Sequence, residues 1–189
     1  MNKIICIVGM TGCGKSEVAD ELVRQGYKFV RFGQITLDIV KERGLEPSEE
    51  NERPIREEVR KQHGMGAFAV LNIPKFDKLL EEGNVVADGL YSWSEYKILK
   101  DHYKERMFVI SVLAPPELRY ERLANRTQVD ENMRSRPATK EQARNRDFAE
   151  IENIEKGGPI AMADYNIINI GTKEELMKKT KEFLKWLTE

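Results

Sequence analysis

Residues 4–16 read IICIVGMTGCGKS and join an apolar run to a glycine-rich turn. The run Ile4–Val8 contains only apolar residues, which is typical of a parallel strand that is covered on both faces. The turn that follows has the pattern G-x-x-x-x-G-K-S, and an amphipathic stretch comes directly after it. A strand, a glycine-rich turn and a helix in this order predict the first unit of a parallel α/β sheet.

The glycine-rich turn predicts a loop that binds the phosphates of a nucleotide, here called the P-loop. Glycines allow successive backbone N–H groups to face inward, and the following helix adds the positive end of its dipole. Lys15 is expected to reach the β and γ phosphates, and Ser16 to ligate Mg²⁺. The predicted nucleotide-binding residues are Gly9, Met10, Thr11, Gly12, Cys13, Gly14, Lys15 and Ser16.

The rest of the chain repeats the alternation of short β-branched runs and amphipathic stretches. This alternation predicts an α/β fold around a parallel sheet. We expect five strands, at residues 4–8, 27–32, 84–87, 107–113 and 165–170. We expect helices at residues 16–24, 35–43, 54–69, 116–126 and 173–187. Proline opens two of these helices, at Pro54 and Pro116, where its missing N–H is tolerated.

Length and composition restrict the kind of protein. The 189 residues suit one domain with a core large enough to fold without disulfides or structural metals. A formal net charge of -1 predicts no broad surface for nucleic acid or anionic membranes. Cys6 and Cys13 are expected to be free thiols, as in a reducing compartment. No signal peptide and no membrane-length apolar stretch is recognisable, so we expect a cytoplasmic protein.

Asp88 is the second candidate site residue because it follows the third predicted strand and precedes Gly89. A carboxylate at this edge of the sheet, beside the P-loop, can hold Mg²⁺ or accept a proton from an attacking hydroxyl. The alternative is an Asp-Gly turn without a catalytic role. A GTPase would show an Asn-Lys-x-Asp segment after a later strand, and this chain has none. The expected cofactors are therefore ATP and Mg²⁺.

Arginines gather at the end of the predicted helix at 116–126 and after it, and they suggest a lid over residues 125–147. Arginine side chains are suited to clamping phosphoryl oxygens with two hydrogen bonds. Together with Lys15 and Asp88, we expect Arg122, Arg126 and Arg146 to act in catalysis. The alternative is an ion-paired, solvent-exposed helix face. The full cluster is Arg122, Arg126, Arg134, Arg136, Arg144 and Arg146, with Glu141, Asp147 and Glu150 as candidate ion-pair partners.

The chain resembles the nucleoside monophosphate kinases, which include adenylate kinase and dephospho-CoA kinase, and within them archaeal-type adenylate-kinase-like proteins. The resemblance rests on the P-loop, the sequence FGQ at 32–34, Asp88-Gly89, the arginine cluster and the sequence INIGT at 168–172. It implies a single three-layer P-loop kinase domain with sheet order 2-3-1-4-5. It also implies acceptor binding by an insert at residues 33–82, and contact of Gly171 and Thr172 with adenine.

The resemblance is incomplete on the acceptor side. Adenylate kinases have arginines after the second strand and after the Asp-Gly pair, and these arginines grip the phosphate of AMP. This chain has Gln34 and Leu37 at the first place, and Leu90 and Tyr91 at the second. AMP is therefore not the expected acceptor.

Other cations are candidates for holding an acceptor. Arg56 and Arg60 are four residues apart, so they share one face of a helix. With Gly33 they are the predicted acceptor-binding residues. The alternative is that both arginines pair with Glu57 and Glu58 on a solvent-exposed face.

Two functions are compatible with the sequence. The first is a kinase that transfers the γ-phosphoryl group of ATP to a small nucleotide-like or CoA-precursor acceptor. The second is an adenylate-kinase-like ATPase switch that acts on a protein or ribonucleoprotein partner. A complete lid favours the first, because a lid excludes water from a second substrate, whereas the missing acceptor arginines favour the second.

Overall fold

Five parallel strands form the centre of this computed structural model, which describes residues 1–126 and 137–188. Their order is β2-β3-β1-β4-β5, which confirms the expected order 2-3-1-4-5. The apolar run of β1 lies in the middle of the sheet, between β3 and β4. The strands are β1 Ile4–Val8, β2 Lys28–Arg31, β3 Val85–Asp88, β4 Met107–Leu113 and β5 Tyr165–Ile168.

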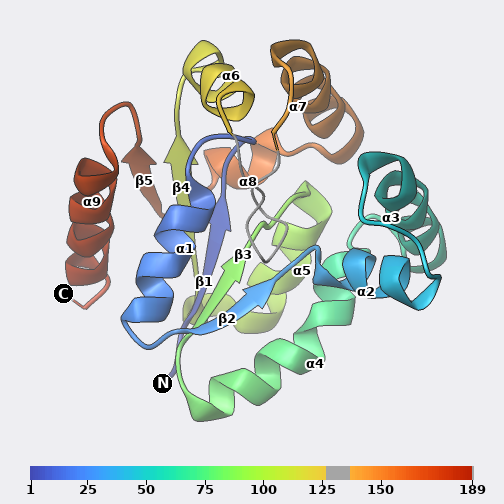
Figure 1. Ribbon diagram of the computed structural model, residues 1–189. Coiled ribbons are helices and arrows are strands. Elements are labelled where there is room, and N and C mark those ends of the chain that lie inside the picture. Colours follow the sequence, from blue (N-terminus) through green and yellow to red (C-terminus); the bar gives the residue numbers. More distant parts are fainter. Residues whose placement is uncertain (127–136, 189) are drawn as a thin grey trace.

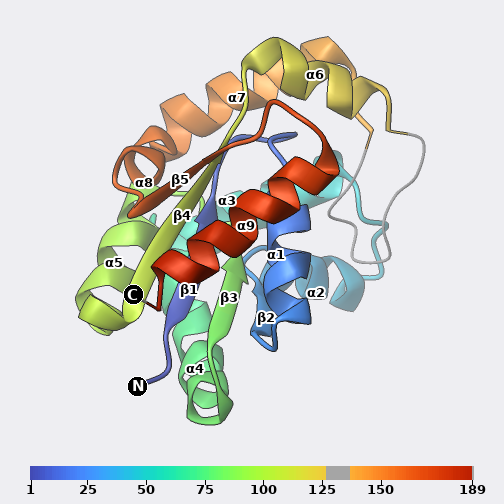
Figure 2. The same ribbon diagram turned by 90° about the vertical axis from the view of Figure 1, so that its left-hand side faces the viewer.

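Helices cover both faces of the sheet, so the fold has three layers (Figures 1 and 2). Alternate residues of β1 belong to two separate cores. Ile4, Cys6 and Val8 pack with residues of α4 and α5, while Ile5 and Ile7 pack with residues of α1 and α9. The helices are α1 Lys15–Arg24, α2 Gln34–Glu42, α3 Glu49–His63, α4 Ala67–Glu82, α5 Trp93–Tyr103, α6 Pro116–Ala124, α7 Lys140–Ile154, α8 Gly157–Ala161 and α9 Lys173–Trp186, and a 3₁₀ turn at Lys104–Arg106 follows α5.

The prediction of one helix over residues 54–69 is wrong. Helix α3 begins five residues earlier, because the Ser48 hydroxyl accepts a hydrogen bond from the N–H of Asn51 at 3.2 Å and caps the helix. Pro54 therefore lies inside α3 and not in its first turn. The helix ends at His63, and Gly64 follows it with a φ of 81°, which suits glycine.

Helices α4 and α5 were not predicted. Pro74 lies inside α4. The sequence does contain the start signal of α5, because Ser92 and Glu95 form a capping box. Phe76 of α4 is fully buried and packs against Phe32 and Tyr103. Helix α4 is therefore part of the main core.

The predicted lid, residues 125–147, is described only at its two ends. Residues 127–136, with Arg134 and Arg136, lie outside the described residues. Helix α6 ends at Ala124, so Arg126 follows the helix and does not lie within it. Helix α7 begins at a capping box formed by Thr139 and Gln142, and it packs along α6.

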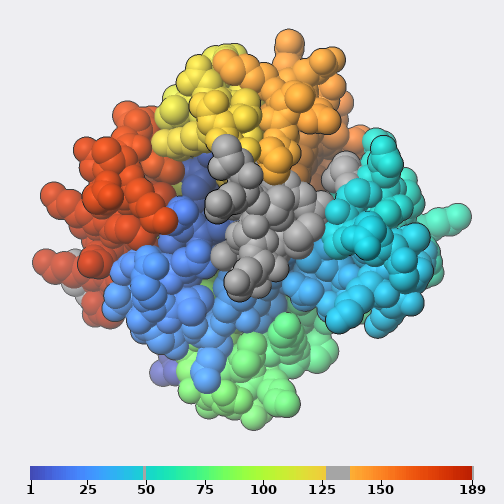
Figure 3. Space-filling view, in the orientation of Figure 1, coloured from blue at the N-terminus to red at the C-terminus, as the bar shows by residue number. Residues whose placement is uncertain are grey.

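Parallel strands bring their carboxyl ends to one edge of the sheet, and the P-loop lies at this edge because it follows β1. Figure 3 shows the insert that contains α2 and α3 at one side of this face, with α6 and α7 above it. Cys6 and Cys13 are buried and unpaired, as expected. In the part of the chain that the structure describes, no helix combines the length and the apolarity needed to cross a membrane.

We predict that Phe76→Ala lowers the free energy of unfolding by about 3–5 kcal/mol, because it leaves a cavity in the core. Val70→Ala on the exposed side of the same helix is the control, with an expected change within about 0.5 kcal/mol. Urea denaturation of both variants measures the difference. Equal effects would show that α4 does not pack against the sheet as described.

Candidate functional site

The backbone of the P-loop needs glycine at three positions. Gly9, Gly12 and Gly14 have φ angles of 142°, 82° and 103°, which side-chain-bearing residues rarely adopt. A β-carbon at Gly9 would collide with the carbonyl of Val112, and one at Gly14 would lie 2.5 Å from the amide nitrogen of Asn169. Steric contacts from other segments therefore explain the glycine pattern.

Side chains hold the carbonyl groups of the P-loop. The Thr11 carbonyl accepts a hydrogen bond from Arg119 Nη1 at 3.0 Å, and the Cys13 carbonyl accepts one from Asn169 Nδ2 at 2.8 Å. The Gly9 and Met10 carbonyls accept hydrogen bonds from Lys15 Nζ at 2.9 and 3.1 Å. Carbonyls fixed on one side of a curled loop favour N–H groups on the other side, which is the arrangement of an anion-binding nest.

Lys15 has acidic and phenolic neighbours from three other elements. Burial acts to lower the pKa of Lys15, but the nearby Cys13, Tyr91, Asp88 and Glu150 outweigh burial and raise the pKa above its ordinary value. The ammonium group therefore stays charged at neutral pH.

Asp88 is the last residue of β3 and pairs in register with Ile7 of β1. It is buried, with 6% of its surface exposed. In the described part of the chain, no three His, Cys, Asp or Glu side chains form a ready metal cage. Mg²⁺ usually takes one or two protein ligands and completes its shell with substrate phosphates and water. Asp88 and Ser16 at the start of α1 fit that mode of binding.

Arg119 is a site residue that the sequence interpretation missed. Its guanidinium is only 4% exposed and forms an ion pair with Asp147 of α7 at 2.6 Å. The same group donates to the Thr11 carbonyl, and Tyr120 donates its hydroxyl hydrogen to Asp147 at 2.9 Å. Arg119 therefore connects the P-loop to both helices at the lid ends. Arg119 lies with Tyr120 and Leu123 on the buried face of α6, and no local sequence pattern marks it as buried.

Arg122 lies on the side of the P-loop where β5 ends. Its Nη1 donates to the Asn169 carbonyl at 3.1 Å, and the Asn169 side chain in turn holds the P-loop. The predicted adenine-contact residues follow in this same loop. Thr172 caps α9 through a capping box with Glu175, and Gly171 is exposed beside it.

Arg146 is paired within its own helix. Its Nε lies 2.9 Å from Glu150 Oε1, and Lys156 contacts the other oxygen of the same carboxylate. The ion-paired alternative therefore describes Arg146. Glu150 is also among the groups that raise the pKa of Lys15.

The three predicted acceptor residues lie at the start of α2 and within the adjacent helix α3. Gly33 precedes α2, while Arg56 and Arg60 lie on α3. Arg56 pairs with Glu52 at 3.3 Å, and not with Glu57 or Glu58 as the alternative had it. Those two glutamates pair instead with Arg53 and Arg43, respectively.

Arg60 has an unusual environment. Its guanidinium lies 5.3 Å from the centre of the Phe68 ring, and its buried Nε has no hydrogen-bond partner. Burial lowers the pKa of Arg60, and the charge of Glu95 partly opposes this. A buried guanidinium nitrogen without a partner is an energetic cost that an anionic ligand would remove.

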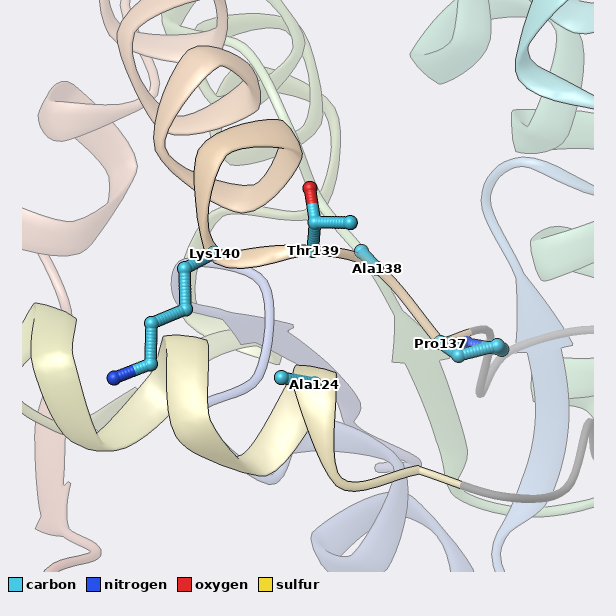
Figure 4. A pocket seen from close by; sticks show the side chains of 5 residues that line it. All are labelled: Ala124, Pro137, Ala138, Thr139 and Lys140. Carbon is cyan, nitrogen blue, oxygen red and sulfur yellow. The ribbon is translucent and has the colours of Figure 1, made fainter.

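A hollow of about 450 Å³ lies between the end of α6 and the start of α7. Figure 4 shows Lys140 pointing away from Pro137, and the Thr139 hydroxyl is already used to cap α7. Among the described residues that line it, the hollow therefore has no convergent polar groups. It is lined by Ala124, Pro137, Ala138, Thr139 and Lys140.

Residues 5–158 match a family described as an AAA domain. A UPF0200 protein of Thermococcus gammatolerans is 37% identical over 180 residues, covering 94% of this chain and 92% of that protein. A UPF0200 protein of Sulfurisphaera tokodaii is also 37% identical, over 185 residues that cover 97% and 96% of the two chains. The chain belongs to the UPF0200 family.

Solved structures similar to this UPF0200 protein include small-molecule kinases. A shikimate kinase from Bacteroides thetaiotaomicron gives a TM-score of 0.60 at 13% identity, covering 97% of this chain and 98% of that one. A gluconokinase from Sinorhizobium meliloti gives 0.59 at 15% identity, covering 98% and 93%. These similarities confirm the expected P-loop kinase fold.

We predict that Gly14→Ala weakens ATP binding and lowers stability, because its β-carbon would press against Asn169 and distort the loop. Gly26→Ala is the matched control, since Gly26 has a φ of 90° with no atom near the added carbon. The control is expected to cost about 1–2 kcal/mol of backbone strain without affecting nucleotide affinity. Calorimetric titration with ATP and thermal unfolding compare the two variants. Equal ATP affinities would contradict the contact.

Proposed function

We propose that this UPF0200 protein is an ATP-dependent phosphotransferase that acts on a small acceptor. The observation that carries the proposal is the environment of Lys15. This residue lies in a loop whose carbonyls are fixed by side chains, and Cys13, Tyr91, Asp88 and Glu150 raise its pKa against the effect of burial. Phosphoryl transfer depends mainly on positioning and charge stabilisation, and a charged lysine surrounded by groups from several elements supports both.

Each predicted residue has a role in this proposal. The P-loop N–H groups and Lys15 bind the phosphates of ATP, while Ser16 and Asp88 hold Mg²⁺, which neutralises charge on the phosphates. Asp88 also orients the acceptor hydroxyl, or takes its proton. Arg122, Arg126 and Arg146 are proposed to stabilise the transferred group. Gly171 and Thr172 lie in the loop after β5, where the adenine is proposed to bind.

The acceptor is proposed to be nucleotide-like or a CoA precursor, with a reactive hydroxyl or phosphate and a second anionic group. The environment of Arg60 is the reason to propose the second anionic group, because the buried Nε of Arg60 has no hydrogen-bond partner. Arg56 and Gly33 lie on the same insert, which is proposed to span residues 33–82. The lid is proposed to span residues 125–147.

An ATPase switch that acts on a protein or ribonucleoprotein partner is the second candidate. The observation that favours it is the ion pairing of Arg56 with Glu52 and of Arg146 with Glu150. Arginines with carboxylate partners need no second substrate to balance their charge. In this case ATP turnover would depend on the partner and not on a small acceptor.

A screen for acceptor-dependent ADP formation tests the proposal. Purified protein is incubated with Mg²⁺, ATP and single members of a panel of nucleotides, nucleosides and CoA precursors. A kinase gives ADP and a phosphorylated acceptor in equal amounts, above the rate without acceptor. If ADP formation stays at the background rate with every acceptor but rises with a macromolecular fraction, the switch replaces the kinase.

Lys15→Ala and Asp88→Asn separate binding from turnover. We predict that Lys15→Ala abolishes tight ATP binding with the fold intact, because it removes the cation that faces the phosphates. Asp88→Asn should keep most of the ATP affinity and lose roughly 10²-fold or more in turnover. Binding is measured by calorimetry, and turnover with the acceptor from the screen. Unchanged affinity in the first variant, or normal turnover in the second, would remove that residue from the site.

A further inference from the structure

Arg119 and Asp147 form a buried ion pair between two helices beside the P-loop. Arg119 lies on α6 and Asp147 on α7, and each has only 4% of its surface exposed. Their charged groups meet at 2.6 Å, between Nη2 and Oδ2. The two helices lie side by side above the carboxyl end of the sheet (Figures 1 and 2). The proposed reaction gives neither residue a role.

The guanidinium of Arg119 distributes its hydrogen bonds over three segments of the chain. Nε donates to the Ala114 carbonyl at 3.1 Å, Nη1 donates to the Thr11 carbonyl at 3.0 Å, and Nη2 donates to Asp147. A guanidinium presents its N–H groups in fixed directions within one plane. The orientation that satisfies one partner therefore sets the direction toward the others. Asp147 thus helps to fix the group that holds the P-loop carbonyl.

The backbone of the P-loop also packs directly on Arg119. A β-carbon at Gly12 would lie 2.7 Å from the Arg119 carbonyl oxygen and 3.1 Å from Leu123 Cγ. No empty space separates this part of the loop from α6, and close-packed interiors transmit displacements instead of absorbing them. A shift of Arg119 would therefore displace the P-loop at Thr11 and Gly12.

Stability alone does not explain this ion pair. Removing two charges from water costs free energy, and well-packed apolar side chains in their place are often at least as stabilising. Oδ2 of Asp147 accepts hydrogen bonds from Arg119 and Tyr120, but Oδ1 is buried and has no partner within the described ranges 1–126 and 137–188. The carboxylate is thus incompletely satisfied, which adds to the cost. The charged pair provides what apolar side chains cannot, a guanidinium held against the Thr11 carbonyl.

We propose that Asp147 is a positioning residue for nucleotide binding, which acts through Arg119 and couples the position of α7 to the shape of the P-loop. The inference rests on the proposed function only for the identity of ATP as the ligand of the P-loop. A coupling free energy is reciprocal. If the ion pair strengthens ATP binding, bound ATP strengthens the contact between α6 and α7. Nucleotide binding would then stabilise the helix that carries Arg146 and Glu150.

The first test removes the ion pair without leaving a buried charge behind. Arg119→Met/Tyr120→Phe/Asp147→Leu replaces both charged groups and the hydroxyl that would lose its acceptor, so its free energy of unfolding should stay near that of wild type. Its affinity for Mg·ATP should fall about tenfold or more, because the Thr11 carbonyl loses its donor. Calorimetry measures the affinity, and urea denaturation measures the stability. Glu152→Gln, on the exposed side of α7, is the control and should change neither.

Single variants show whether Asp147 acts through Arg119. Asp147→Asn removes the negative charge but keeps the shape, and Arg119→Lys keeps a cation without the planar fork. Each should weaken Mg·ATP binding. The double variant should bind about as weakly as Arg119→Lys alone, because Asp147 then has no route to the P-loop. Losses that multiply in the double variant would show that Asp147 acts by another route, and would overturn the inference.

Hydrogen exchange measures the reciprocal effect on α7. Saturation with Mg²⁺ and a non-hydrolysable ATP analogue should slow exchange in α7 of wild-type protein. The same saturation should slow it much less in Asp147→Asn. A purely structural role of Asp147 would lower the stability of the variant but leave this protection unchanged. Equal protection in the two proteins would therefore contradict the coupling.

The Mg·ATP affinity of wild-type protein distinguishes a failure of this inference from a failure of the proposed function. If wild type binds Mg·ATP and the triple variant binds it equally well, the ion pair is structural only, and the proposed kinase still stands. If the triple variant does not fold, the two single variants and their double variant decide. If wild type binds no Mg·ATP, the proposed function and this inference both fail.

Discussion

The candidate site depends on the hydrogen bonds that hold the carbonyl groups of the P-loop. A curled loop can direct its N–H groups at an anion only if its carbonyls find partners elsewhere. Arg119 binds the Thr11 carbonyl, and Asn169 binds the Cys13 carbonyl. These two side chains come from α6 and from the loop after β5. The nucleotide site is therefore built by three segments that are distant in sequence, and not by the P-loop motif alone.

The same contacts connect the P-loop to the lid ends. Arg119 holds Asp147 of α7 as well as the P-loop, so a movement of α7 would act directly on the loop. Arg146 is the neighbour of Asp147 in sequence and lies on the same helix. Of the charged groups that raise the pKa of Lys15, Asp88 comes from β3 and Glu150 from α7. This arrangement supports a closed site in which charge is positioned before the reaction.

Local patterns in the sequence predicted the strands and the P-loop, because apolar runs and glycine spacing report on their own neighbourhood. Pro54 misled the helix prediction, because it was expected to open a helix but lies inside α3, which begins at the cap that Ser48 forms. The sheet order came from a family resemblance. Arg119 and Lys156 were missed because nothing local marks a charged residue as buried. Their burial depends on partners 28 and 6 residues away, Asp147 and Glu150.

The most direct test of this account is the affinity of Mg·ATP for the Asn169→Leu variant, measured by calorimetry beside wild type. Leucine keeps the volume but cannot donate to the Cys13 carbonyl. Loss of this hydrogen bond, with a buried carbonyl left unpaired, is worth about 1–3 kcal/mol. If the carbonyl contacts shape the nucleotide site, affinity falls roughly tenfold or more while the protein stays folded. Wild-type affinity in the folded variant would contradict the account.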